Sequence, residues 1–551
     1  MDSENCSQDY QSRSLEKRKD RSVLGLVLFV LACATLLRMV GVYRYALGPD
    51  EMMVWSIARG RDLYEVLRRT SFEVHPPLEP IVKHFLLFFS TDPDVIRLGY
   101  VGLGLASLMF LSFAVPSDRV RSARLIIVMC AAISETLIHV SVLLRGYCFL
   151  LFGLSVALWS MRRIVQGSYV TIRGPALLMM CSLIFAGCCG VSGFLAAPAI
   201  VLTSFLHVPR LSLGKRLLYT GGILAALVLI AMVIFYFQFH PASGATAWRS
   251  LARSDLFSAC SAFSNSTAAI IRTLHLFSPL PLSLTSPTLL IVFGFGGFMV
   301  VVGALAYCWH TYRWICTYSA ISLISAVVAH AGGIYPISSP RHMVFVCLAL
   351  LLPVSVALAR AINGMVRPWI LVCCVVVYSV VCAVSDVHFK DHPDFSVSRE
   401  TQRYVDRELD DVGAKSATVF ASRFGLLYVL QRIDGQQTFY MGLDSVGLSS
   451  TTVYVCAPEL LWQSTRASLS RCVQDKVQES VWLFSAGFAD NLMSELYGCF
   501  TRTDRVLEDR TRAGVQLFRV RTADLMDALT GECLQGVGRS YREDHCARAI
   551  L

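Results

Sequence analysis

The stretch that decides the fold is residues 44–83, RYALGPDEMMVWSIARGRDLYEVLRRTSFEVHPPLEPIVK, which separates one long apolar run from a series of others. It contains the acidic pair Asp50 and Glu51, and it ends where His75-Pro76-Pro77 leads back into apolar sequence. Ionisable side chains at the mouth of a membrane span are costly to keep, so they are functional candidates. The structural alternative is that Asp50 caps a helix over residues 52–58, because Asp is a favoured N-cap residue.

The composition indicates a membrane protein. Of the 551 residues, 55% are hydrophobic and 16% are charged, and only lipid could cover that much apolar surface. The net charge of +10 comes from Lys and Arg residues that gather in short loops between apolar runs. This distribution is typical of cytoplasmic loops and not of a nucleic-acid-binding surface, so we expect membrane lipids and no nucleic acid as partners.

The apolar runs predict a multi-span domain over residues 22–385. Residues 1–21 are polar and end in a basic cluster, and the run 22–43 is too long for a signal-peptide core, so we expect a cytoplasmic N-terminal tail and a retained first span. Further runs lie at 95–116, 124–143, 146–161, 175–190, 193–207, 216–238, 288–309, 314–331, 341–360 and 368–385. The fold class is therefore an α-helical polytopic membrane protein with about 11–13 transmembrane helices.

The distribution of basic loops predicts the orientation. Residues 77–90 form either a re-entrant or tilted piece or one more crossing. With the first alternative, the chain crosses eleven times and its basic loops all face the cytoplasm. The outer loop 44–77, Arg145, residues 335–342 and the segment 386–551 then share the outer face.

Two distant stretches carry a resemblance to a known family. The acidic pair followed by HPPL, and GGIYPISSPRHMVFV over residues 332–346, resemble the GT-C membrane glycosyltransferases. The similarity is to the branch that holds the protein O-mannosyltransferases and the bacterial lipid A aminoarabinose transferases. Arg145-Gly146-Tyr147 resembles a family motif more loosely. The resemblance covers roughly residues 23–384 in layout and implies a GT-C fold with its active site on the outer face.

This resemblance implies an inverting glycosyltransferase that moves a sugar from a polyprenyl-phosphate donor to a protein, lipid or glycan acceptor. Such a reaction needs a base for the acceptor proton, which Asp50 or Glu51 can supply. The analogy with the family favours Asp50. Arg145, Arg341 and His342 are candidate partners of the departing phosphate, because guanidinium groups stabilise charge as it develops on a leaving group.

Four other side chains are candidates for substrate binding. His75 could bond the phosphate or orient the carboxylate, or it could be a structural histidine beside two prolines. Lys83 could pair with a carboxylate or phosphate, or it could snorkel to the interface. Tyr147 and Tyr335 are expected to shape the groove. No metal-ligand spacing is visible, so we expect no required cofactor, while the two acids leave room for a divalent ion.

Residues 386–551 have a lower mean hydropathy than the preceding spans. This drop predicts a soluble α/β domain. Residues 397–410 have a helical pattern, and ATVFA, TVYVC, SVWLF and VQLFRV read as strands of an open sheet. No GxGxxG or Walker loop is present, so nucleotide binding is not supported. By resemblance, this domain handles the acceptor or packs against the membrane domain. The polar loop 239–287 could meet a lipid phosphate or anchor at the interface.

The sequence thus predicts an integral-membrane glycosyltransferase of the bacterial inner membrane, with its active site and C-terminal domain in the periplasm. The endoplasmic reticulum with a luminal site is the alternative location. The rival functions are a multi-span transporter and a non-catalytic protein that binds lipid-linked glycans. A transporter should contain internal repeats, and none is visible in the sequence.

Overall fold

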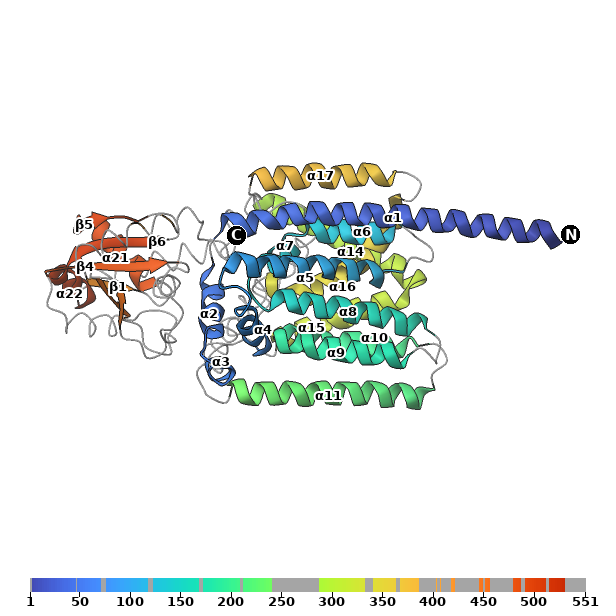
Figure 1. The fold of residues 1–551 in the computed structure, drawn as a ribbon, viewed down its shortest axis with the longest axis horizontal. Coiled ribbons are helices and arrows are strands. Elements are labelled where there is room, and N and C mark those ends of the chain that lie inside the picture. Colours follow the sequence, from blue (N-terminus) through green and yellow to red (C-terminus); the bar gives the residue numbers. More distant parts are fainter. Residues whose placement is uncertain are drawn as a thin grey trace. The chain divides into compact units, whose positions relative to one another are not determined.

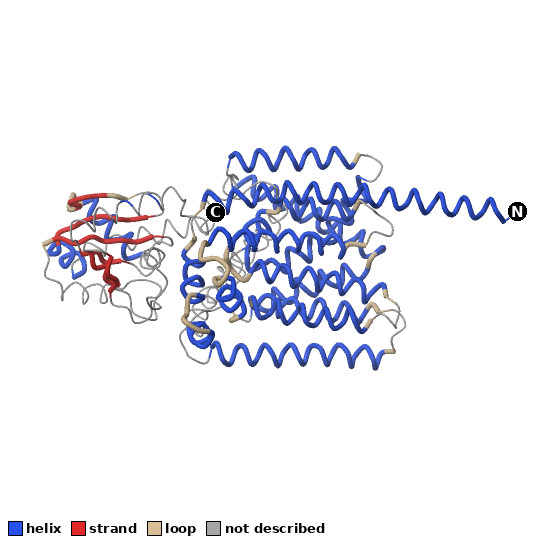
Figure 2. Tube along the Cα trace, in the orientation of Figure 1, coloured by secondary structure: helices blue, strands red, loops and turns tan. Residues whose placement is uncertain are grey.

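The computed structural model confirms an α-helical polytopic protein with a small C-terminal sheet (Figure 1, Figure 2). The structure describes residues 2–45, 47–70, 76–116, 122–167, 172–208, 212–239, 287–331, 340–362, 367–385, 403, 407, 418–421, 445–448, 451–455, 479–486, 491–511 and 515–530. The chain divides into two compact units. The first contains residues 1–40, 74–79 and 97–388, and the second contains residues 41–73, 80–96 and 389–551.

The first unit holds the long apolar helices, apart from the last residues of α1 and the first of α5. Its elements are α1 (Asp2–Arg44), α5 (Pro93–Ala114), α6 (Ala123–Ile133), α7 (Glu135–Val142), α8 (Tyr147–Gln166), α9 (Arg173–Cys189), α10 (Val191–Leu206), α11 (Leu213–Phe239), α14 (Pro287–Thr311), α15 (Arg313–Ala331), the 3₁₀ helix η3 (Pro340–Met343), α16 (Val344–Ile362) and α17 (Pro368–Ser385). The polar N-terminal residues continue the helix of the first span. Helices are expected here because lipid offers the backbone no hydrogen-bond partners.

Each predicted apolar run corresponds to a helix or a helix pair. Within the described part of the chain, six helices are long and apolar enough to cross a membrane, and the bent pair α6 and α7 makes a seventh if it counts as one span. Shorter apolar helices lie in α9, α10, α14 and α15 and correspond to the remaining runs. At ~1.5 Å per residue, the nine-residue helix α4 (Leu78–Leu86) is too short to cross, so of the two alternatives for residues 77–90 the re-entrant or tilted piece fits this helix and a further crossing does not.

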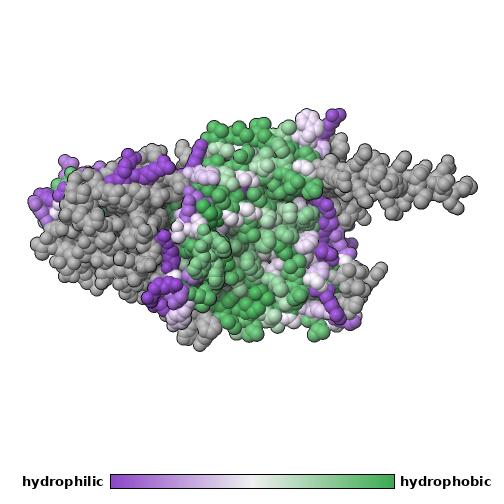
Figure 3. All heavy atoms as spheres, viewed as in Figure 1, coloured by the Kyte–Doolittle hydropathy of each residue, from purple (hydrophilic) through white to green (hydrophobic). Residues whose placement is uncertain are grey.

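The helices form a bundle with a buried centre and a lipid-facing surface. In α8 and α16, 72% of the apolar window is buried, against 6% in α11 and 22% in α17. Figure 1 accordingly shows α11 and α17 on opposite margins of the bundle. Figure 3 shows a hydrophobic band across the helices, with hydrophilic residues at both of their ends. This pattern is what a membrane-embedded surface requires, and the protein is an integral membrane protein.

The second unit contains three short helices from the first third of the chain. They are α2 (Pro49–Ala58), α3 (Leu63–Thr70) and α4, whose first two residues belong to the other unit. The imidazole of His84 on α4 makes a 2.8 Å hydrogen bond through Nδ1 to the carbonyl oxygen of Ala58 at the end of α2. This contact ties the re-entrant piece to the segment that carries the acidic pair.

The C-terminal part of the second unit is a six-stranded sheet in the order β2-β3-β1-β4-β6-β5. The strands are β1 (Thr418–Ala421), β2 (Ser445–Leu448), β3 (Thr451–Val455), β4 (Ser480–Ala486), β5 (Val506–Asp509) and β6 (Val515–Arg521). Strand β1 is parallel to β3 and β4, and the remaining pairs are antiparallel. The predicted strands correspond to β1, β3, β4 and β6, while β2 and β5 were not predicted. The predicted helix 397–410 lies largely outside the described residues.

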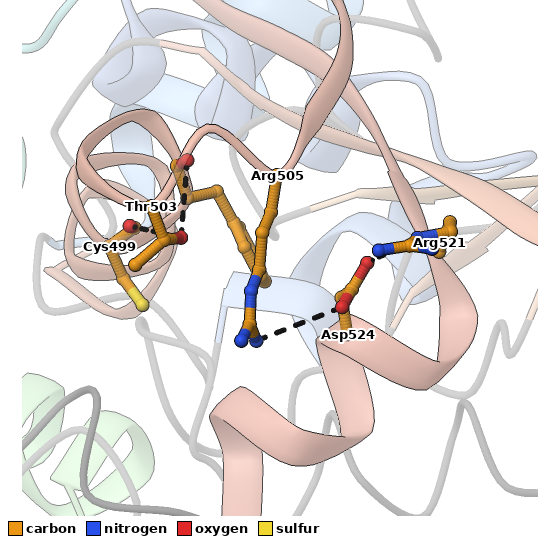
Figure 4. A network of polar contacts seen from close by, with 6 residues as sticks. Cys499, Thr503, Arg505, Arg521 and Asp524 are labelled. Carbon is orange, nitrogen blue, oxygen red and sulfur yellow. Dashed lines mark hydrogen bonds and ion pairs between the residues drawn. The ribbon is translucent and has the colours of Figure 1, made fainter.

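Two helices, α21 (Asn491–Arg502) and α22 (Thr522–Thr530), complete the α/β layer and share a core with β4 and β6. Figure 4 shows the polar side of this packing. The buried carboxylate of Asp524 forms ion pairs with Arg521 at 2.6 Å and with Arg505 at 3.7 Å. Arg505, which precedes β5, and Arg521, the last residue of β6, thereby both contact the first turn of α22. In the same region, Cys499 is disulfide-bonded.

Candidate active site

The acidic pair lies in the first turn of α2, where Glu51 has a structural role. The helix begins after Gly48, with Pro49 at its first position and Glu51 at its third. The backbone N–H of Gly48 donates a 2.7 Å hydrogen bond to Oε2 of Glu51, which is buried. The alternative that Asp50 is the N-cap is therefore wrong. The helix begins earlier because proline is preorganised for the first helical position, and Glu51 reaches back to the cap.

Asp50 itself occupies the second position of α2, and its side chain lies outside the described residues. Glu51 accepts the N–H of the cap residue. Asp50 stays the base that the sequence predicts.

Helix α4, which forms the re-entrant piece, carries two buried ionisable side chains. His75 lies outside the described residues, and Pro76 and Pro77 lead directly into the helix. Glu79 is in its first turn and Lys83 follows four residues later, a spacing that places both on one face of the helix. Both side chains are buried. The ammonium of Lys83 therefore does not snorkel to the surface, and that alternative is wrong.

The Arg145-Gly146-Tyr147 segment forms the tight link between α7 and α8. Arg145 N–H donates to the carbonyl of Leu143 at 2.8 Å, and both Arg145 and Tyr147 are buried. Position 146 requires a glycine because neighbouring atoms leave no room for a Cβ. A Cβ at this position would lie 2.3 Å from the carbonyl oxygen of Cys189 and 3.1 Å from Oε2 of Glu79. The carboxylate of Glu79 therefore lies against the same short segment that presents Arg145 and Tyr147.

The second family-like stretch reaches this segment through η3. His342 is buried, and its ring lies 6.2 Å from the ring of Tyr147, centroid to centroid, with an angle of 49° between the planes. Helix α7 also packs against η3. Tyr335 and the side chain of Arg341 lie outside the described residues. Two stretches that the sequence separates widely thus meet in the first unit.

Glu79 thus lies against the segment of Arg145 and Tyr147, and the ring of Tyr147 lies beside that of His342, all of them buried. A buried guanidinium acts more strongly than an exposed one, because little water screens it. Sequence reasoning missed Glu79 and the packing role of Gly146. A carboxylate two residues after Pro77 and four residues before Lys83 was the signal for Glu79. Among the described residues, no group of three or more His, Cys, Asp and Glu side chains could hold a metal ion.

Comparisons with known proteins agree with this architecture. No protein-family model and no curated protein matches the chain. Among solved structures, ArnT from Cupriavidus metallidurans in the apo state matches with a TM-score of 0.53 and 14% identity, over 92% of this chain and 99% of that chain. ArnT from the same organism bound to undecaprenyl phosphate matches with a TM-score of 0.50 and 14% identity, over 91% of this chain and 98% of the other. The chain therefore shares its fold with these ArnT structures.

Proposed function

We propose that the protein is an inverting glycosyltransferase that moves a sugar from a polyprenyl-phosphate donor to an acceptor hydroxyl at the outer face of the membrane. The observation that carries this proposal is the approach of distant stretches to one segment: Glu79 lies against Gly146, and the ring of Tyr147 lies beside that of His342. The fold supports the same reaction class, because ArnT, which shares it, has been crystallised with undecaprenyl phosphate. The acceptor is a protein, a lipid or a glycan.

The proposed reaction is a single displacement. The acceptor oxygen attacks the anomeric carbon, the bond between that carbon and the phosphate oxygen breaks, and polyprenyl phosphate leaves with the bonding electrons. Asp50 accepts the acceptor proton. Arg145, Arg341 and His342 stabilise the negative charge on the departing phosphate, with Lys83 and His75 as further phosphate-binding candidates. Tyr147 and Tyr335 shape the groove around the sugar.

The test is chemical and works while the acceptor is still unidentified. Lipid and glycoconjugate analysis of a deletion strain should show one sugar modification missing, and the wild-type gene should restore it. Purified protein in proteoliposomes should then consume the polyprenyl-phosphate sugar only when the acceptor is added. Movement of a solute across the bilayer without sugar transfer would identify a transporter. Donor binding without turnover would identify a non-catalytic glycan-binding protein.

We propose the bacterial inner membrane as the location, with the C-terminal domain in the periplasm. The disulfide at Cys499 supports an oxidising compartment for this domain. Single cysteines introduced at Asp62 and Asp504 should react with an impermeant maleimide in intact cells. Cysteines at Ser212 and Arg367 should react only after permeabilisation. Labelling of the second pair in intact cells would contradict the proposed orientation, in which the site residues share the outer face. The transferase proposal would then fail.

Arg341 offers a separate test of leaving-group stabilisation. Arg341→Lys keeps the charge but removes the planar fork that bonds two phosphate oxygens, so we expect turnover to fall by at least about tenfold while the protein still inserts. Arg360→Lys, at the other end of the following helix α16, is the matched control and should transfer sugar at the wild-type rate. Unchanged turnover in Arg341→Lys would remove this residue from the site.

A further inference from the structure

Arg38 is a fully buried cation in the C-terminal half of the first span, and the proposed chemistry does not use it. Its Nη1 donates to the carbonyl oxygens of Ala34 at 3.0 Å and Ala132 at 3.4 Å, and its Nη2 donates to that of Leu137 at 3.3 Å. No carboxylate forms an ion pair with it among the described residues. A cation in a membrane span is expensive, so these carbonyl contacts need an explanation.

The two distant carbonyls lie on either side of a helix break. Helix α6 ends at Ile133, Ser134 has extended dihedral angles (φ −65°, ψ 118°), and α7 begins at Glu135 at an angle of 67° to α6. Such a break leaves the last carbonyls of α6 without their intrahelical donors, and the membrane interior offers no water to replace them. A guanidinium has five donors and a positive charge that suits the C-terminal end of a helix dipole.

The break controls the position of the candidate site. From its bend, α7 packs against η3 and leads directly to Arg145 and Tyr147. Helix α7 also lies so near α5 that a Cβ on Gly104 would be 2.6 Å from the Cβ of Ser141. Arg38 thus contacts the end of α6 and the first part of α7, on the two sides of the break that precedes Arg145 and Tyr147.

We propose that Arg38 is a positioning residue that acts as a side-chain cap for the broken pair α6 and α7 and thereby holds Arg145, Tyr147 and η3 in register. It touches no reacting atom in this role. The proposal rests on the proposed function only for its effect on turnover. Its structural part stands on the three carbonyl contacts and applies whatever the protein transfers.

The test compares Arg38→Met, Arg38→Lys and the control Thr35→Val in full-length protein in detergent micelles. Thr35 lies in the same helix, and its hydroxyl bonds only the Leu31 carbonyl within α1. Hydrogen exchange read by mass spectrometry should be at least about tenfold faster over residues 133–148 in Arg38→Met, with α9 and α10 unchanged. Thr35→Val should exchange like the wild type. Arg38→Lys should fall between, because an ammonium has three donors and cannot span the break as a planar fork does.

Turnover supplies the second measurement. Displacement of the site by the order of 1 Å lowers rates by about 10²-fold, so Arg38→Met should lose turnover to that extent with little change in the KM for the donor. Unchanged exchange over 133–148, or equally faster exchange in every helix, would overturn the proposal, and so would full turnover in Arg38→Met. Should Arg38→Met fail to insert, Arg38→Lys gives the same decision. If the wild type transfers no sugar, the proposed function fails, while the exchange measurement still decides the role of Arg38.

Discussion

Asp50→Asn is expected to lower turnover by roughly 10²- to 10⁴-fold, the usual contribution of a positioned general base, while insertion and folding stay normal. The substitution removes the proton acceptor and keeps the size of the side chain. Asp50 is not the cap of α2, because Gly48 occupies the cap position and Glu51 accepts its N–H. Loss of an N-cap is therefore not expected in Asp50→Asn. The measurement is sugar transfer in proteoliposomes beside thermal unfolding of the purified variant.

Glu51→Gln is the matched control for this experiment. The glutamine carbonyl oxygen can still accept the Gly48 N–H, so we expect near-normal turnover and a small loss of stability. Glu51→Ala removes the acceptor and leaves a buried N–H unsatisfied, which costs about 1–3 kcal/mol and should lower the melting temperature. Loss of turnover in Glu51→Gln with normal turnover in Asp50→Asn would make Glu51 the base. Normal turnover in both would end the glycosyltransferase proposal.

Gly146→Ala is expected to have an effect of similar size through packing. The new Cβ would lie 2.3 Å from the Cys189 carbonyl oxygen, a contact that no side-chain rotation can relieve because the obstacle is backbone. The first turn of α8 must then move away from α9, and it carries Arg145 and Tyr147 with it. A shift of this kind should reduce turnover by about 10²-fold and destabilise the protein by roughly 1–3 kcal/mol.

The control for Gly146→Ala is Gly222→Ala in α11. No atom lies within 4 Å of a Cβ at this second glycine, and alanine is the better helix former, so both turnover and stability should stay at or above the wild-type level. The paired measurement of transfer rate and melting temperature separates a local displacement from a general loss of folding. Wild-type turnover in Gly146→Ala would show that the Arg145 segment does not need its present position.

Hydropathy along the sequence was enough to locate the membrane helices. A bilayer needs about 20 apolar residues per span and excludes unpaired backbone groups, so hydropathy over a short window is enough to find most spans, from residues 22–43 to 368–385. Basic loops then predict the orientation. The strands β1, β3, β4 and β6 were predictable for a similar local reason, because β-branched and aromatic residues alternate in them. The short strands β2 and β5 lack so clear a pattern.

Only the tertiary structure decided which side chains meet. That Glu51 and not Asp50 serves the cap depended on where α2 begins, and the choice between a crossing and a short helix at α4 depended on where that helix ends. The approach of Glu79 to Gly146 and the contact of Tyr147 with His342 join segments that are far apart in the chain. The reach of Arg38 to the carbonyls at the break also crosses from one helix to others. Local hydropathy carries no information about such contacts, because they follow from how whole helices pack.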